Sequence, residues 1–102
     1  MQEISSNEWK QKTEKDSDGI ILDVRTDEEV EEGIIPGAKQ INISDPASFM
    51  ENANKLDKSK NYYIYCRSGG RSAQACAVLE SMGIENTYNL LGGISEWDGP
   101  VE

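Results

Sequence analysis

The chain has 102 residues, 36 % of them apolar, and its 10 basic and 19 acidic side chains give a formal net charge of −9. This length predicts one domain over residues 1–102, and no apolar run approaches the roughly 20 residues of a membrane-spanning helix. The acidic balance argues against nucleic acid and anionic membrane as partners, and the absence of histidine excludes histidine-based catalysis and histidine metal ligands.

The first predicted elements are a helix and a strand. Ser5 and Glu8 have the spacing of a capping box that opens a helix, and Ile4 and Trp9 have that of a hydrophobic staple. The nearly all-apolar run at 20–24 is typical of a strand that is buried on both faces, which indicates a parallel sheet.

The middle of the chain predicts a short helix, a turn, a strand and a second helix. A capping box at 26–29 opens the short helix. The Pro-Gly pair at 36–37 predicts a turn, and a short strand is expected over 39–43. Asp45 is placed to cap the next helix, with Pro46 at its first position, where a missing N–H does no harm.

The second half continues the alternation. The aromatic and β-branched run at 62–65 predicts the strongest strand, and a helix is expected over 72–82, ended by Gly83 in a Schellman motif. A last strand near 87–90 leads to a glycine turn and a short terminal helix at 92–97. Strands that alternate with helices in this way indicate an α/β fold with a mostly parallel sheet.

The residues that carry chemistry follow the strongest strand. Cys66 stands at its carboxyl end, the edge at which parallel sheets bind ligands, and a glycine-rich loop leads from it into a helix. Loop N–H groups and the positive end of a helix favour a negatively charged group. The Cys66 sulfur is placed to be that group, because helix N-termini and cations such as Arg67 and Arg71 lower a thiol's pKa from about 8.5. Gly69 and Gly70 allow the backbone to curl around it.

The alternative interpretation of Cys66 is a small buried hydrophobe in a strand-to-helix turn, because free cysteines are among the most buried residues. A core cysteine would not need two glycines flanked by two arginines. The sequence therefore favours a nucleophilic sulfur that needs no histidine base.

The other marked residues are interpreted as structural. Arg25 is expected to pair with the glutamates of the predicted short helix and so to fix its loop, and Asp23 to bond local backbone or the same network. Cys76 has helical spacing with apolar residues and is expected in the core, with a resolving thiol as the alternative. Trp9 and Trp97 are expected to cover the core.

The cysteine content also bears on location. Two cysteines, behind an N-terminus with neither a basic region nor an apolar segment, favour free thiols in a reducing cytoplasm. The acid excess is read as a source of solubility, with a basic protein partner as the alternative.

Three separated stretches make the chain similar to single-domain rhodaneses, a sulfurtransferase family, over almost its whole length. Asp23-Val24-Arg25, followed by the run at 33–38, resembles the family's strand-and-turn signature. The run Cys66-Arg67-Ser68-Gly69-Gly70-Arg71-Ser72 is similar to its active-site loop. The run at 92–97 resembles its closing segment.

The resemblance implies a rhodanese-like three-layer fold, in which a central, mostly parallel five-stranded sheet has helices on both faces. It also implies a thiosulfate sulfurtransferase-type enzyme without metal or organic cofactor. Cys66 would be the catalytic residue, taking a sulfane sulfur from a small anionic donor such as thiosulfate. The resulting persulfide would pass that sulfur to cyanide, a thiol or a protein acceptor. The implied substrate-binding residues are Arg67, Ser68, Gly69, Gly70 and Arg71.

One departure and two alternatives accompany this resemblance. Ile34 stands where the family often has histidine, which affects only a local polar contact. A persulfide carrier or protein-binding module is the first alternative. Cysteine phosphatases and arsenate reductases are the second, and their loops resemble Cys-x5-Arg, whereas Cys66 to Arg71 is one residue shorter.

Overall fold

The computed structural model describes all 102 residues, and its five strands form one sheet in which every neighbouring pair is parallel. The strands are β1 (Gln2–Ile4), β2 (Gly19–Asp23), β3 (Lys39–Gln40), β4 (Asn61–Tyr65) and β5 (Asn86–Leu90), in the spatial order β1-β5-β4-β2-β3. The helices are α1 (Ser6–Lys15), α2 (Asp27–Glu31), α3 (Pro46–Asn54), α4 (Gly70–Ser81) and the 3₁₀ helix η1 (Ile94–Glu96). The predicted α/β fold is confirmed.

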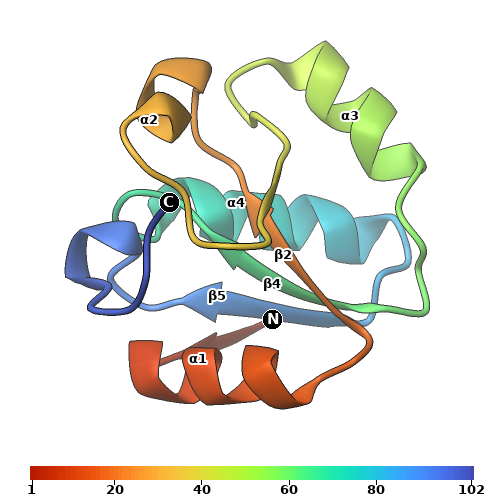
Figure 1. Cartoon of the computed structure of the whole chain (residues 1–102). Coiled ribbons are helices and arrows are strands. Elements are labelled where there is room, and N and C mark those ends of the chain that lie inside the picture. Colours follow the sequence, from red (N-terminus) through yellow and green to blue (C-terminus); the bar gives the residue numbers. More distant parts are fainter.

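Helices cover both faces of the sheet, with α1 on one face and α4 on the other (Figure 1). Successive side chains of β4 point to opposite faces, as a strand requires. Ile64 joins a buried cluster with Leu79 of α4 and Phe49 of α3. Tyr63 and Tyr65 belong to a second cluster around Trp9 of α1, whose ring centroid is 6.0 Å from each tyrosine ring. The sheet is therefore the central layer of three.

The caps that the sequence predicts account for most element boundaries. Thr26 and Glu29 form a complete capping box at α2, whereas Ser5 accepts from the Glu8 N–H at 3.3 Å without a returning bond. Asp45 caps α3, with Pro46 in its first turn. At the end of α4, the Gly83 and Ile84 N–H groups donate to the carbonyls of Glu80 and Leu79, which is the Schellman pattern.

Three differences from the sequence predictions exceed one residue. β1 was not predicted, because Gln2 and Glu3 are exposed polar residues that become a strand only by pairing with β5. The strand expected over 39–43 is limited to Lys39–Gln40 at the sheet edge. α4 begins at Gly70, two residues before the predicted start, so only residues 66–69 lie between β4 and α4 and the helix N-terminus is nearer to Cys66.

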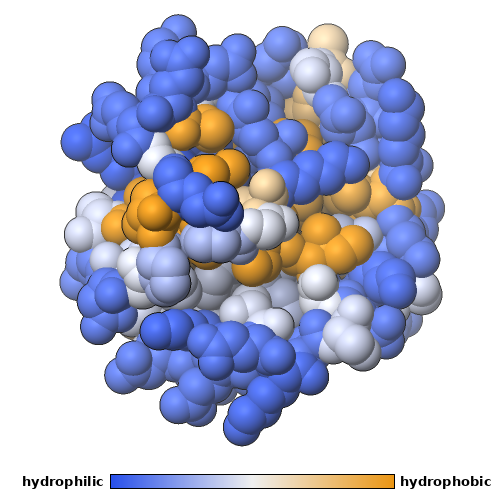
Figure 2. All heavy atoms as spheres, in the orientation of Figure 1, coloured by the Kyte–Doolittle hydropathy of each residue, from blue (hydrophilic) through white to orange (hydrophobic).

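The surface agrees with the charge of the chain. Hydrophilic side chains cover the upper and lower parts of the face in Figure 2, and apolar ones gather in a band between them. Among the few large apolar residues that are well exposed are Leu91 and Met50. None of the helices is both long enough and apolar enough to cross a membrane.

Candidate active site

Cys66 lies at the carboxyl end of β4, which runs in the sheet between β5 and β2. A glycine turn supports its backbone from behind. The Ile94 N–H donates to the Cys66 carbonyl at 3.0 Å, and the Ser95 N–H donates to the Arg67 carbonyl at 3.0 Å. A Cβ on Gly93 would lie 2.6 Å from the Cys66 carbonyl oxygen and closer still to that of Arg67, so only glycine allows this approach. The Cys66–Ser72 loop is thus held by the segment 92–97.

The Cys66 sulfur accepts hydrogen bonds from the loop and the start of the helix that follow it. The Gly69 N–H lies 3.0 Å from Sγ and the Ser72 hydroxyl 3.3 Å from it. Gly69 is the residue that turns its N–H inward, with φ +110° in the region that favours glycine. Gly70 has no such role, since it is helical and a Cβ there would meet no atom within 4 Å.

Opposing influences act on the ionisation of Cys66. Burial is the largest of them and raises the pKa of the thiol. Hydrogen bonds from the Ser72 side chain and from the backbone of Ser72, Gly69 and Ser68 act in the opposite direction. Together they hold the pKa of Cys66 below its ordinary value, which favours the nucleophilic thiolate.

The two arginines of the loop take different positions. Arg71 makes a two-pronged ion pair with Glu29 of α2, with N–O distances of 2.7 and 2.8 Å. Arg67 is exposed and has no acidic partner within 4 Å. It borders a hollow of about 180 Å³ whose other lining residues are Arg25, Glu29, Glu32, Ile94 and Ser95. Arg67, rather than Arg71, is therefore the cation of the loop that is free to meet an anion.

A buried charged network fixes the neighbouring loop. Arg25 pairs with Asp23 at 2.6 Å and donates to the Gly33 carbonyl at 2.7 Å. The expected ion pairs between Arg25 and the helix glutamates are wrong, because Arg25 reaches α2 only through the Glu29 carbonyl. The Tyr65 hydroxyl donates to Asp23 at 2.6 Å and accepts from the Ile35 N–H. Tyr65 thus joins β4 to the loop after α2, and Asp23 holds both Tyr65 and Arg25.

Three further predictions concern residues outside the loop. Cys76 is fully buried in the core beside Leu79, and burial raises the pKa of its thiol to about 11. Trp97 packs edge-on against Trp9, with ring centroids 5.4 Å apart. Ile34 anchors its loop by exchanging two backbone hydrogen bonds with Glu102.

Sequence reasoning missed Asn89, and it placed Ser72 only at the start of the helix. Both side chains are fully buried, and the Ser72 hydroxyl lies 2.5 Å from Asn89 Oδ1. Asn89 also donates to the Gly69 carbonyl at 3.2 Å, so it contacts both Ser72 and Gly69, which donate to the sulfur. The available signal in the sequence was an amide inside a predicted strand, next to the apolar Leu90. A polar side chain that is buried in a strand needs a hydrogen-bond partner.

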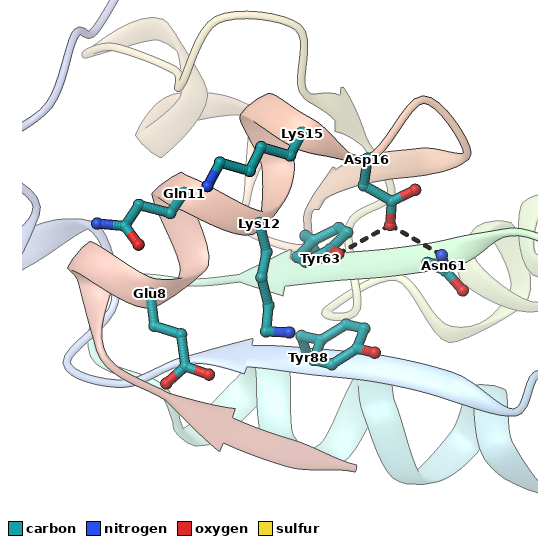
Figure 3. A pocket seen from close by; sticks show the side chains of 8 residues that line it. All are labelled: Glu8, Gln11, Lys12, Lys15, Asp16, Asn61, Tyr63 and Tyr88. Atoms are coloured by element: carbon teal, nitrogen blue, oxygen red, sulfur yellow. Dashed lines mark hydrogen bonds between the residues drawn. The ribbon is translucent and has the colours of Figure 1, made fainter.

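The largest surface hollow lies elsewhere. This groove of about 560 Å³ is drawn in Figure 3, and it lies beside α1, along the first half of β4 and the middle of β5. Asp16 accepts from Tyr63 and Asn61 there, and the Lys12 ammonium stands 5.5 Å from the centre of the Tyr88 ring. The β4 residue of the groove that is nearest to Cys66 in sequence is Tyr63, three residues before it, which is roughly 10 Å at the usual rise of a strand. The groove holds no cysteine, so the candidate nucleophile Cys66 is not part of it.

Comparisons with known proteins agree with this geometry. The family described as "Rhodanese-like domain" matches residues 5–99. A Bacillus subtilis (strain 168) protein named "Putative sulfurtransferase YtwF" is 43 % identical over 102 residues, which cover 100 % of this chain and 95 % of that protein. "Putative sulfur carrier protein YrkF" of the same organism is 36 % identical over 98 % of this chain, which spans 52 % of that protein. The crystal structure of a rhodanese-like domain protein from Staphylococcus aureus superposes with a TM-score of 0.87 at 39 % identity, covering 100 % of this chain and 97 % of that chain.

Proposed function

The chain belongs to the rhodanese-like domain family, and from this premise we propose that it transfers a sulfane sulfur from a small anionic donor to a thiophilic acceptor through a Cys66 persulfide. The observation that supports this most directly is the position of the Cys66 sulfur. It accepts the Gly69 N–H at 3.0 Å beside the N-terminus of α4, at the carboxyl edge of a parallel sheet.

The first half-reaction loads the sulfur. The Cys66 thiolate attacks the outer sulfur of thiosulfate, a new S–S bond forms, and the S–S bond of the donor breaks with both electrons leaving on sulfite. The Cys66 persulfide then carries its negative charge on the outer sulfur. The loop N–H groups and the positive end of α4 stabilise that charge, as oxyanion holes do.

The second half-reaction unloads it. An acceptor nucleophile such as cyanide or a thiolate attacks the outer sulfur, and the electron pair of the breaking S–S bond returns to Cys66 as thiolate.

Arg67 attracts the donor anion, because it is the loop cation without an acidic partner. Arg71 acts at one remove by holding α2 against the loop through Glu29. Ser68, Gly69 and Gly70 supply backbone rather than side chains.

The decisive experiment is intact mass spectrometry of the protein after incubation with thiosulfate. Loading adds one sulfur atom, and peptide mapping places it on Cys66. Cys66→Ser should gain no sulfur and should retain its thermal unfolding midpoint, whereas the matched control Cys76→Ala should load as the unchanged protein does. Equal loading of folded Cys66→Ser would overturn the assignment.

A persulfide carrier is the second candidate, favoured by the relative that is named as a sulfur carrier. A carrier and an enzyme both load Cys66, so the unloading rate separates them. An enzyme returns loaded Cys66 to thiol within one turnover time when cyanide or a small thiol is added. A carrier retains its sulfur under those conditions. Both roles fit the free thiols of Cys66 and Cys76 and the reducing cytoplasm that we propose as the location.

Phosphate or arsenate chemistry receives less support from the loop. In such enzymes an arginine binds the oxyanion through two hydrogen bonds. Here both Nη groups of Arg71 already donate to the Glu29 carboxylate. Hydrolysis of p-nitrophenyl phosphate that depends on Cys66 would favour that class instead.

A further inference from the structure

The Ser72 hydroxyl lies within hydrogen-bond distance of more acceptors than it can serve. Its oxygen is 2.5 Å from Asn89 Oδ1, 3.2 Å from the Gly69 carbonyl and 3.3 Å from Cys66 Sγ. A hydroxyl has one proton to donate. The Gly69 carbonyl already accepts from the Ala73 N–H and from Asn89 Nδ2, so it needs no third donor. Asn89 and Cys66 remain as the two groups that compete for this proton.

The orientation of the Asn89 amide follows from its surroundings. Its Nδ2 lies 3.2 Å from the Gly69 carbonyl and 3.2 Å from a carboxylate oxygen of Glu3, both of which only accept. Oδ1 must therefore face Ser72, and Ser72 is the one donor that reaches it. Asn89 is fully buried, so an unpartnered Oδ1 would be costly.

We propose that Asn89 is a positioning residue that holds the Ser72 hydroxyl proton while Cys66 is a thiol and yields it to the sulfur when Cys66 ionises. In the thiol state Cys66 donates its S–H to Ser72 Oγ, and Ser72 donates to Asn89. On ionisation the S–H proton leaves to solvent, and the Ser72 O–H rotates toward the thiolate without breaking. The inference deepens the proposed sulfur transfer and rests on Cys66 being its nucleophile.

The consequence is that the Cys66 thiolate is stabilised less than the loop alone would stabilise it. Ionisation of Cys66 leaves Asn89 Oδ1 without a hydrogen-bond donor. Because this costs free energy, Asn89 keeps the pKa of Cys66 higher than the loop alone would set it. A thiol attacks best when its pKa is near the ambient pH. A lower pKa makes the thiolate less nucleophilic, and a higher pKa leaves less of the thiol ionised. Forming the persulfide moves the charge to the outer sulfur, and the Ser72 proton can then return to Asn89.

Charged groups near this network are Arg67 in the loop, Arg71 of α4 with its partner Glu29 of α2, Arg25 after β2 and Glu3 of β1. The test should leave all five unchanged. It uses the pH midpoint of Cys66 alkylation by iodoacetamide, which requires no sulfur donor. Sulfur loading and this proposal can therefore fail independently of each other.

The test is a double-mutant cycle on Asn89 and Ser72. Asn89→Leu should lower the Cys66 midpoint by roughly half to one pH unit, because Ser72 can then donate to the thiolate without orphaning an amide oxygen. In the Ser72→Ala background the same substitution should leave the midpoint unchanged. Asn86→Leu, the same replacement at the exposed amino end of β5, is the matched control and should also leave it unchanged. Equal shifts in both backgrounds, or no shift in either, would overturn the proposal.

A second measurement covers the case in which Asn89→Leu does not fold. The NMR signals of the Asn89 side-chain amide in the unchanged protein should move with pH at the Cys66 midpoint, as Oδ1 loses its donor. In Ser72→Ala that movement should fall to less than about half, since the sulfur charge still forms but no proton is shared. An Asn89 amide that stays constant through the midpoint, or moves equally in both proteins, would contradict the proposal.

Discussion

Cys66 and Cys76 are both buried, yet their surroundings act on them in opposite directions. Cys76 lies within α4 against the core, where burial raises the pKa of the thiol to about 11. Cys66 is penalised by burial as well, but donors from Ser72, Gly69 and Ser68 outweigh that penalty and lower its pKa. Exposure therefore does not separate the two thiols, whereas hydrogen bonding to the ionised form does.

This contrast predicts selective alkylation. At pH 7.5 iodoacetamide should modify Cys66 at least about 100-fold faster than Cys76, and the Cys66 rate should have a pH midpoint below about 8.5. Peptide mass spectrometry over a pH series measures both rates. A Cys66 midpoint at or above the free-thiol value would contradict the activated thiolate and favour a binding module.

At the scale of elements, the Cys66–Ser72 loop depends on contacts with distant parts of the chain. The turn at 92–93 supports it from the C-terminal side, and α2 holds it through the Glu29–Arg71 pair. The loop also has bonds of its own, from Gly69 and Ser72 to the Cys66 sulfur and from Ser72 to the Gly69 carbonyl. The loop geometry should therefore be sensitive to changes in the turn and in α2.

Gly93→Ala should damage the loop although it lies far from Cys66 in sequence. Gly93 has φ +62° and ψ −164°, which L side chains rarely adopt, and a Cβ would run into the Arg67 and Cys66 carbonyls. We expect a loss of stability of about 1–3 kcal/mol together with reduced sulfur loading. Gly70→Ala is the matched control and should leave both unchanged. Urea unfolding and mass spectrometry measure the pair, and a stable, fully active Gly93→Ala would contradict the backing role.

Glu29 predicts a pH-dependent contribution to stability. The hydrogen bonds from Arg71 lower the pKa of Glu29 from 4.5 to about 2, with Thr26 adding to the effect. Since the folded-state pKa is depressed, the stabilisation is complete above about pH 4.5 and is lost as the pH falls toward about 2.

Glu29→Gln should accordingly cost about 1–2 kcal/mol at pH 7, and the difference from the unchanged protein should shrink steadily below pH 4.5. Urea unfolding at pH 7, 4 and 3 measures it, with Glu28→Gln, exposed on the same helix, as the control. A difference that stays constant over this range would show that the ion pair is not its source.

At the scale of the whole molecule, the charge of −9 opposes the substrate that the loop is proposed to bind. The molecule measures 31 × 29 × 20 Å, so at about 10 mM salt, where the screening length is about 30 Å, an approaching dianion meets nearly all of that charge. At about 0.15 M the length falls to about 8 Å, and the groups near Arg67 dominate.

Sulfur loading from thiosulfate should therefore become faster with added salt. Between about 10 mM and 0.15 M we expect the second-order rate to rise about two- to fivefold, because repulsion by remote acids is screened. The rate of alkylation of Cys66 by uncharged iodoacetamide, measured in parallel, corrects for any change in thiolate fraction. Loading that slows with salt would mean that local attraction by Arg67 outweighs the net charge.

The sequence by itself determined the parts of this protein that depend on near neighbours. The caps at Thr26 and Asp45, the Schellman end at Gly83 and the buried strands are local patterns with local causes. The position of Cys66 at the end of a central strand, before glycines and a helix, is equally local.

Tertiary structure decided the remainder, since it concerns pairs of residues that are distant in the chain. β1 exists because β5 offers it a partner 86 residues away, counted from Glu3 to Asn89. Arg71 turns to Glu29, 42 residues away, which leaves Arg67 as the free cation. Asn89 reaches Ser72 across 17 residues. The type of a residue determines which hydrogen bonds and ion pairs it can make. Only the packing of strands and helices decides which partner is close enough to make them.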